Sequence, residues 1–163
     1  MIPLIPDIQK ILYVTDLSKN ARYAFGYAAY LGSLTGAGIT ILHVLEERSP
    51  YSASLVMNIL GEDKWKELRE ANSQKVTETI RERLQSFCEE VGSSQPDCSF
   101  ITEEIVIKIG NPVEEILRLA NQGGVDMVVM GARGHGVLED AMIGSTSRRV
   151  LRRCRKPVLV IRL

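Results

Sequence analysis

The sequence has no excess of either charge and no closely paired cysteines, and both absences narrow the classes of protein to consider. Twenty basic residues balance twenty acidic ones, so net charge gives no reason to expect a nucleic-acid or membrane partner. Cys88, Cys98 and Cys154 are widely spaced and form no CxxC pair. This pattern predicts reduced thiols rather than a zinc site or a disulfide framework.

Long apolar runs are also missing. No stretch approaches the ~20 apolar residues needed to cross a bilayer, and the first residues lack the basic segment and apolar run of a secretory signal. With the cysteine pattern, this predicts a cytoplasmic protein. A chain of 163 residues with 45% hydrophobic content is expected to form a single domain, residues 1–163, with its own core.

Short apolar runs alternate with amphipathic stretches along the whole chain. Strands are predicted at residues 10–14, 39–45, 100–109, 127–130 and 157–161. Helices are predicted at 19–35, 63–91, from Asn111 to the glycines at 123 and 124, and after residue 144. Residues 46–62 are the least regular and are expected to form a loop with a short helix. This alternation indicates an α/β protein with a parallel sheet and helices on both faces.

Residues 125–150 combine a buried strand, a glycine-rich loop and the start of a helix. Four glycines and three hydroxyl residues punctuate the loop and the helix start: Gly131, Gly134, Gly136, Gly144, Ser145, Thr146 and Ser147. Glycines let the backbone approach a ligand, and a helix N-terminus attracts anions through its N–H groups and dipole. The stretch therefore predicts a phosphate site. The alternative is a sharp turn followed by a helix that a serine caps.

Two well-known phosphate motifs do not match this stretch. A Walker loop needs a lysine directly after its second glycine, but Ser145 follows Gly144. The dinucleotide fingerprint fails because Glu139 occupies the place of its third glycine. The spacing that remains, Gly131-x2-Gly134-x9-Gly144-Ser145, resembles the ATP-binding signature of the universal stress protein family.

This resemblance extends over essentially the whole chain. The other landmarks are KILYVTDLS at 10–18, LHV at 42–44, GNP at 110–112 and KPVLV at 156–160. The family implies an adenine-nucleotide alpha-hydrolase-like, Rossmann-like sandwich and commonly a homodimer. With this resemblance in view, the sheet is expected to be five-stranded and doubly wound, in the order 3-2-1-4-5. The glycine loop and Thr15-Asp16 would then meet at the switch point of the sheet.

The resemblance also implies a set of nucleotide-binding residues. Asp16, with Thr15, would hold the ribose or adenine end; Val44 would line the adenine pocket. The ribose and phosphates would follow Met130, Gly131, Ala132, Arg133 and Gly134, and the phosphates would reach Gly144, Ser145, Thr146 and Ser147. The alternatives remain open: Asp16 as a helix N-terminal acid, Val44 as strand core, and Arg133 as a solvent-exposed side chain.

The resulting hypothesis is a nucleotide-dependent regulator of the stress response that binds ATP, ADP or AMP, with slow or no hydrolysis. One alternative is an ATP-hydrolysing or nucleotidyl-transferring enzyme. Its candidate base, His135, has no obvious partner, and His43 inside a strand is interpreted as structural. Glu139 and Asp140 could hold Mg²⁺ through the phosphates, or be solvated acids.

A second alternative is a nucleotide-free dimeric scaffold, and in either dimer the Val158–Ile161 strand at the sheet edge is the expected contact. The arginines between 148 and 155 are either cations placed to suit the helix dipole or a basic rim for phosphates or an acidic partner.

Overall fold

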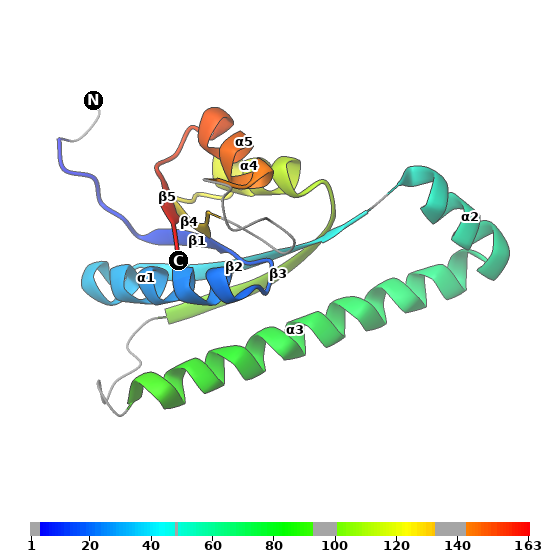
Figure 1. The fold of residues 1–163 in the computed structure, drawn as a ribbon, viewed down its shortest axis with the longest axis horizontal. Helices are drawn as coiled ribbons and strands as arrows, with labels where there is room; N and C mark the ends of the chain where they lie inside the picture. The colour runs from blue at the N-terminus through cyan, green and yellow to red at the C-terminus, as the bar shows by residue number, and fades with distance from the viewer. Residues whose placement is uncertain (1–3, 48, 93–100, 133–142) are drawn as a thin grey trace. The chain divides into compact units, whose positions relative to one another are not determined.

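The computed structural model of the protein describes residues 4–47, 49–92, 101–132 and 143–163 (Figure 1). The chain divides into two compact units. The first consists of residues 1–44 and 99–163, and the second of residues 45–98. Within the described residues, no helix is long and apolar enough to cross a membrane.

The first unit contains the parallel sheet and three of the helices that connect its strands. Its elements are β1 (Lys10–Val14), α1 (Lys19–Thr35), β2 (Gly38–Glu46, whose last two residues belong to the second unit), β3 (Ile101–Gly110), α4 (Pro112–Gln122), β4 (Met127–Gly131), α5 (Ser145–Arg153) and β5 (Val158–Ile161). The strand order β3-β2-β1-β4-β5 confirms the predicted topology. The five strands and α1 begin and end within one residue of the predicted bounds.

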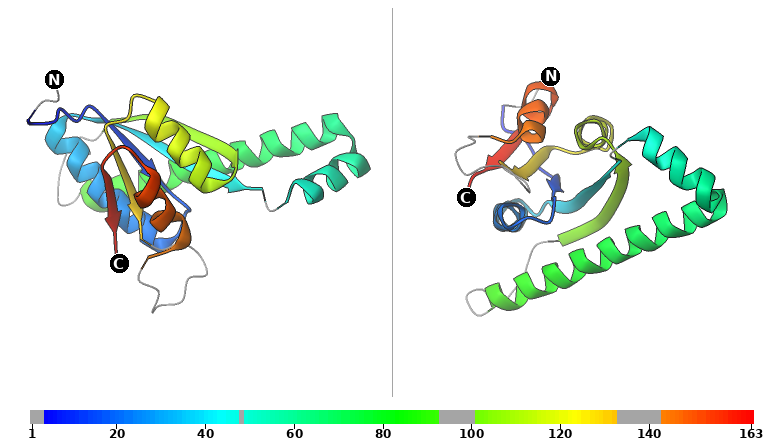
Figure 2. Two further views of the ribbon diagram at one scale, coloured as in Figure 1. Left: turned by 90° about the horizontal axis from the view of Figure 1, so that it is seen from above. Right: turned by 45° about the vertical axis from the view of Figure 1, so that its right-hand side comes forward.

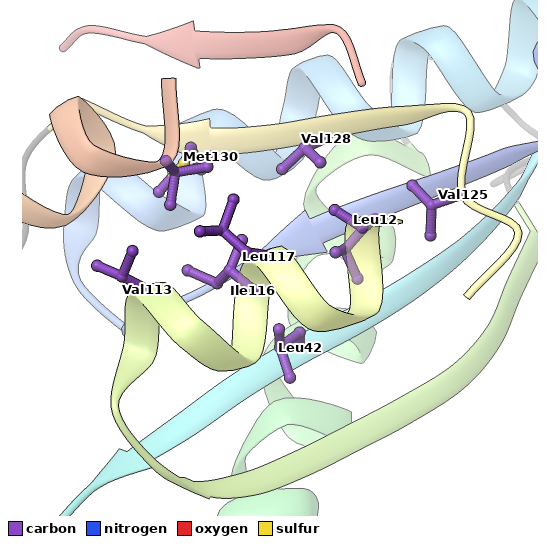
Figure 3. Packing of buried hydrophobic residues seen from close by; sticks show 10 residues of the cluster. Leu12, Leu42, Val113, Ile116, Leu117, Val125, Val128 and Met130 are labelled. Carbon is purple, nitrogen blue, oxygen red and sulfur yellow. The ribbon is translucent and has the colours of Figure 1, made fainter. Parts of the chain in front are cut away.

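Helix α1 covers one face of the sheet in the first unit, and α4 with α5 covers the other (Figures 1 and 2). On the α1 face, the Tyr13 ring packs against Phe25 with centroids 5.1 Å apart, and its hydroxyl donates to the Ala21 carbonyl. On the opposite face, Figure 3 shows buried side chains from β1, β2, β4 and α4 packed together. Burial on both faces explains why these strands are almost continuously apolar.

Local signals determine both ends of α1. Ser18 accepts a hydrogen bond of 3.1 Å from the Ala21 amide as N-cap, and Gly36 ends the helix with a φ of 74°. A left-handed residue of this kind favours glycine. Both ends of this helix are thus set by residue types that the sequence itself shows.

The second unit contains two helices, α2 (Pro50–Leu60) and α3 (Glu62–Gly92). Most of the segment expected to be a loop with a short helix is thus helical: Ser49 caps α2, and Gly61 ends it with a φ of 86°. The charged face of α3 is exposed and carries ion pairs one turn apart, such as Lys66–Glu62 at 3.3 Å.

The cysteine prediction is wrong in part. Cys88 on α3 is disulfide-bonded, whereas Cys154 is free. Cys88 is half-buried.

Candidate functional site

The candidate site lies where the strand order of the sheet reverses. Val14 at the end of β1 pairs with Met130 of β4 on one side and with Leu42 of β2 on the other. Thr15 and Gly131 directly follow the paired residues Val14 and Met130, so they are neighbours at the carboxyl edge of the sheet. Open parallel sheets bind ligands at this edge.

The turn after β1 is held by hydrogen bonds to all three polar groups of Thr15. Its amide donates to the Leu42 carbonyl at 2.9 Å, its Oγ1 accepts from the Leu17 amide at 3.0 Å, and its carbonyl bonds His43 Nδ1 at 2.7 Å. Thr15 is only 6% exposed. The segment that presents Asp16 is therefore fixed in place.

Leu17 has a left-handed backbone conformation, with a φ of 66°. Among the described residues it is the only one other than glycine with positive φ. A leucine in this region is strained, and such strain persists only where the surroundings enforce it. The bonds of Thr15 and the bond from the Ser18 amide to Asp16 Oδ1, at 3.0 Å, supply that constraint.

The contact of His43 is one that sequence reasoning missed. A carbonyl oxygen can only accept, so Nδ1 of His43 must carry the proton that bonds Thr15. The histidine is thus structural, as expected, but the structure that it supports is the turn at the candidate site. No local sequence signal links it to Thr15, which lies 28 residues earlier.

Gly131 at the end of β4 lies against Asn20 of α1. A Cβ added at Gly131 would lie 2.5 Å from Asn20 Nδ2, so only glycine fits here without displacing that side chain. Asn20 is 8% exposed. Asn20 was not among the predicted site residues, although a polar residue at the start of the buried face of α1 was a usable signal.

The ends of the glycine-rich segment are bonded to each other. The Gly144 amide donates to the Ala132 carbonyl at 2.6 Å, and Ser147 Oγ donates to the Gly131 carbonyl at 2.8 Å. The Ala132 amide donates to Ile161 of β5 at 2.7 Å. Ala132 is fully buried, so both of its main-chain polar groups serve the fold.

Helix α5 begins without a side-chain cap. Its N-cap is Gly144, which makes no side-chain hydrogen bond, and its first turn contains no acidic residue. Ser145 is exposed and Thr146 is half-buried. Within the described residues, no N-cap side chain and no acid of the first turn therefore competes with an anion for the first N–H groups and the positive end of the helix dipole.

Two further predicted residues lie near this edge. Val44 of β2 is half-buried and packs against the hydrophobic core cluster, and Met130 is 4% exposed. Arg133, Gly134, Gly136, His135, Glu139 and Asp140 lie outside the described residues. Within the described part of the chain, no group of three or more His, Cys, Asp or Glu side chains could hold a metal ion.

The arginines of α5 lie on its exposed side. Arg148, Arg149, Arg152 and Arg153 are all exposed. Arg152 and Arg153 fall in the last turn, where cations stabilise the helix dipole. Arg152 and Arg153 therefore suit the helix dipole, and the exposure of all four arginines is equally compatible with a basic rim.

Curated relatives match this chain over nearly its full length. MJ0577 of Methanocaldococcus jannaschii, a universal stress protein, is 30% identical over 158 residues, which is 94% of each chain. The universal stress protein YxiE of Bacillus subtilis is 28% identical and covers 94% of this chain and 98% of its own.

Solved structures share the fold. The structure of MJ0577 gives a TM-score of 0.73 at 27% identity and covers 97% of this chain and 98% of its own. A universal stress protein solved in complex with cAMP gives a TM-score of 0.56 at 21% identity, over 96% of this chain and 98% of that one. The model of the universal stress protein family matches residues 7–162. The chain belongs to the universal stress protein family.

Proposed function

We propose that this protein binds an adenine nucleotide, ATP, ADP or AMP, and acts as a nucleotide-dependent regulator in the stress response. The observation that carries the proposal is the uncapped N-terminus of α5 at the edge of the sheet where the strand order reverses. Membership of a family in which a relative has been solved with cAMP supports it. The spacing of Gly131, Gly134, Gly144 and Ser145 supports ATP in particular.

The residues present suit such a ligand. The N–H groups at the start of α5, with the Ser145 and Thr146 hydroxyls, would hold the phosphates. Asp16 offers a carboxylate for the ribose hydroxyls, and Val44 an apolar surface for the adenine. Magnesium would accompany the phosphates of the ligand.

We propose that hydrolysis is slow or absent. Phosphoryl transfer to water requires a group that orients the water and charge that stabilises the transferred phosphoryl group. His43 lies beside the β1 turn, but its Nδ1 is engaged with the Thr15 carbonyl. It supports the fold of the site in this arrangement rather than serving as a base through that atom.

The β5 strand is our proposal for the dimer contact. It lies at one edge of the sheet, and Val158, Leu159 and Val160 are half-buried. An apolar edge strand can pair with its copy around a two-fold axis. Sedimentation of the wild type against a Val160→Lys variant tests this contact, because a charge at the centre of the paired edge should yield monomers.

A thermal-shift titration with ATP and magnesium tests nucleotide binding directly. Ligand at a hundred times its dissociation constant should stabilise the folded state by about 2.7 kcal/mol, a readily measured shift in Tm. The same titration with ADP, AMP and GTP gives the preference for phosphate number and base. Phosphate release from ATP, followed over hours, then measures any hydrolysis.

A variant used to test the binding site must leave the fold intact. A Gly131→Val substitution would drive a side chain into Asn20, so loss of binding in that variant could reflect a distorted fold. Ser145 is the better position because its side chain is exposed. Absence of a shift in the wild type, in protein shown by extraction and mass analysis to carry no nucleotide, would contradict the proposed function.

A further inference from the structure

Ser147 is the last of the three hydroxyl residues at the start of α5, and the structure sets it apart from the other two. Its side chain is 4% exposed, whereas Ser145 is exposed and Thr146 is half-buried. Its Oγ donates a hydrogen bond of 2.8 Å to the carbonyl oxygen of Gly131. The three hydroxyls therefore do not form one equivalent set.

The chemistry of a hydroxyl group limits what Ser147 can do in this position. A serine hydroxyl has a single proton to donate, and the Gly131 carbonyl can only accept it. The oxygens of an ionised phosphate are acceptors as well. While Ser147 donates to Gly131, it has no proton for a phosphate oxygen.

The bond joins two segments that other contacts also hold. On one side of Gly131, the amide of Asn20 leaves no room for a Cβ. Beside it, the Gly144 amide donates to the Ala132 carbonyl at 2.6 Å. The end of β4 is thus held between α1 and the start of α5, and the Ser147 hydroxyl adds a side-chain bond between β4 and α5.

We propose that Ser147 is a positioning residue: it ties the start of α5 to the end of β4 and does not itself bind phosphate. The tie sets where the N–H groups of Ser145 and Thr146 lie relative to Gly131. The assignment to a nucleotide site rests on the proposed function, but the tie itself can be measured without any ligand.

Amide hydrogen exchange in nucleotide-free protein tests the tie. In a Ser147→Ala variant, the Gly144 amide should exchange about tenfold faster than in the wild type, the factor expected when one hydrogen bond that holds the segment is lost. Ser145→Ala is the matched control, since it removes an exposed hydroxyl two residues away, and should leave exchange at Gly144 unchanged. Ser147→Thr keeps the hydroxyl and should restore slow exchange. Equal exchange at Gly144 in the wild type and Ser147→Ala would overturn the proposal.

Affinities for ATP and adenosine, measured by calorimetry, separate positioning from phosphate binding. Ser147→Ala should weaken both ligands by the same factor, because displacing Gly131 alters the site for either one. Ser145→Ala should weaken ATP and leave adenosine unchanged. A loss in Ser147→Ala that is confined to ATP would show a direct phosphate contact and overturn the proposal. If the wild type binds neither ligand, the proposed function is wrong, and exchange at Gly144 still decides whether the tie exists.

Discussion

Helices α4 and α5 pack against each other on one face of the sheet, yet their N-termini are built differently. At α4, Asn111 Oδ1 accepts a hydrogen bond of 3.2 Å from the Glu114 amide, Pro112 occupies the start of the helix, and Glu114 and Glu115 fall in the first turn. At α5, Gly144 provides no side-chain cap, and the first turn has no acidic residue. Among the described residues, side chains cap and neutralise the N-terminus of α4, whereas α5 has no N-cap side chain and no acid in its first turn.

This difference separates a helix start that serves only the fold from one that can serve a ligand. A capping side chain occupies the first amides, and acidic residues neutralise the positive end of the dipole. Both therefore leave fewer N–H groups and less positive charge for an external anion. Every helix start has amides without a partner in the helix. The segment Asn-Pro-Val-Glu-Glu at 111–115 provides a side-chain cap and two acids there, whereas the segment Gly-Ser-Thr-Ser at 144–147 provides no N-cap side chain and no acid.

The largest effect is expected when α5 is given the acidic first turn of α4. Ser145→Asp places a carboxylate where the phosphates are proposed to bind, and like charges at an interface cost several kcal/mol. ATP affinity should fall about 100-fold by calorimetry. The free protein should be slightly more stable in urea, because an acid suits the helix N-terminus.

Ser145→Asn is the matched control for this change, since it has nearly the size of aspartate without the charge. It should retain most of the affinity for ATP. If Ser145→Asp binds ATP as tightly as Ser145→Asn does, the phosphates lie elsewhere and the contrast between the two helices has no functional meaning.

A smaller effect is expected when α5 receives the cap of α4. Gly144 has a φ of −63° and a ψ of 159°, a conformation that an asparagine can adopt at an N-cap. The side chain of Gly144→Asn would occupy amides that the ligand needs. Because asparagine in place of glycine at an N-cap contributes only a few tenths of a kcal/mol, ATP affinity should fall about twofold while the free protein becomes slightly more stable in urea. A rise in stability with unchanged affinity would mean that the ligand does not use these amides.

Much of the fold could be predicted because its signals are local. The apolar run at 127–130 and the amphipathic period of 19–35 each depend on neighbours in the sequence, and so do the Ser18 cap and the Gly36 stop. The strand order could not be predicted from local patterns alone, since these leave several topologies open. The family resemblance helped to choose among them. Residues 46–62 were harder, because α2 has an uncharged sequence without the polar face of an ordinary surface helix.

The candidate site could be located from the sequence, but the contacts that shape it could not. His43 bonds Thr15 across 28 residues, and Ser147 bonds Gly131 across 16. Residue type shows that a serine can cap, bind phosphate or bond a carbonyl, but only the packing of β4 against α5 selects among these. The same holds for Asn20, whose place against Gly131 depends on how α1 lies over the sheet.

The smallest effect on binding is expected at α4, and it completes the comparison. Asn111→Ala removes the cap that accepts from Glu114, so the free energy of unfolding in urea should fall by about 1 kcal/mol. ATP affinity should stay the same as in the wild type, because the amide that loses its cap lies beside Glu114 and Glu115, whose carboxylates repel an anion. Asn111→Ser, which retains a capping oxygen, should recover most of the stability. An Asn111→Ala variant that loses ATP affinity as Gly144→Asn does would show that the two N-termini are energetically coupled, and that a cap on one helix cannot be altered without changing the site on the other.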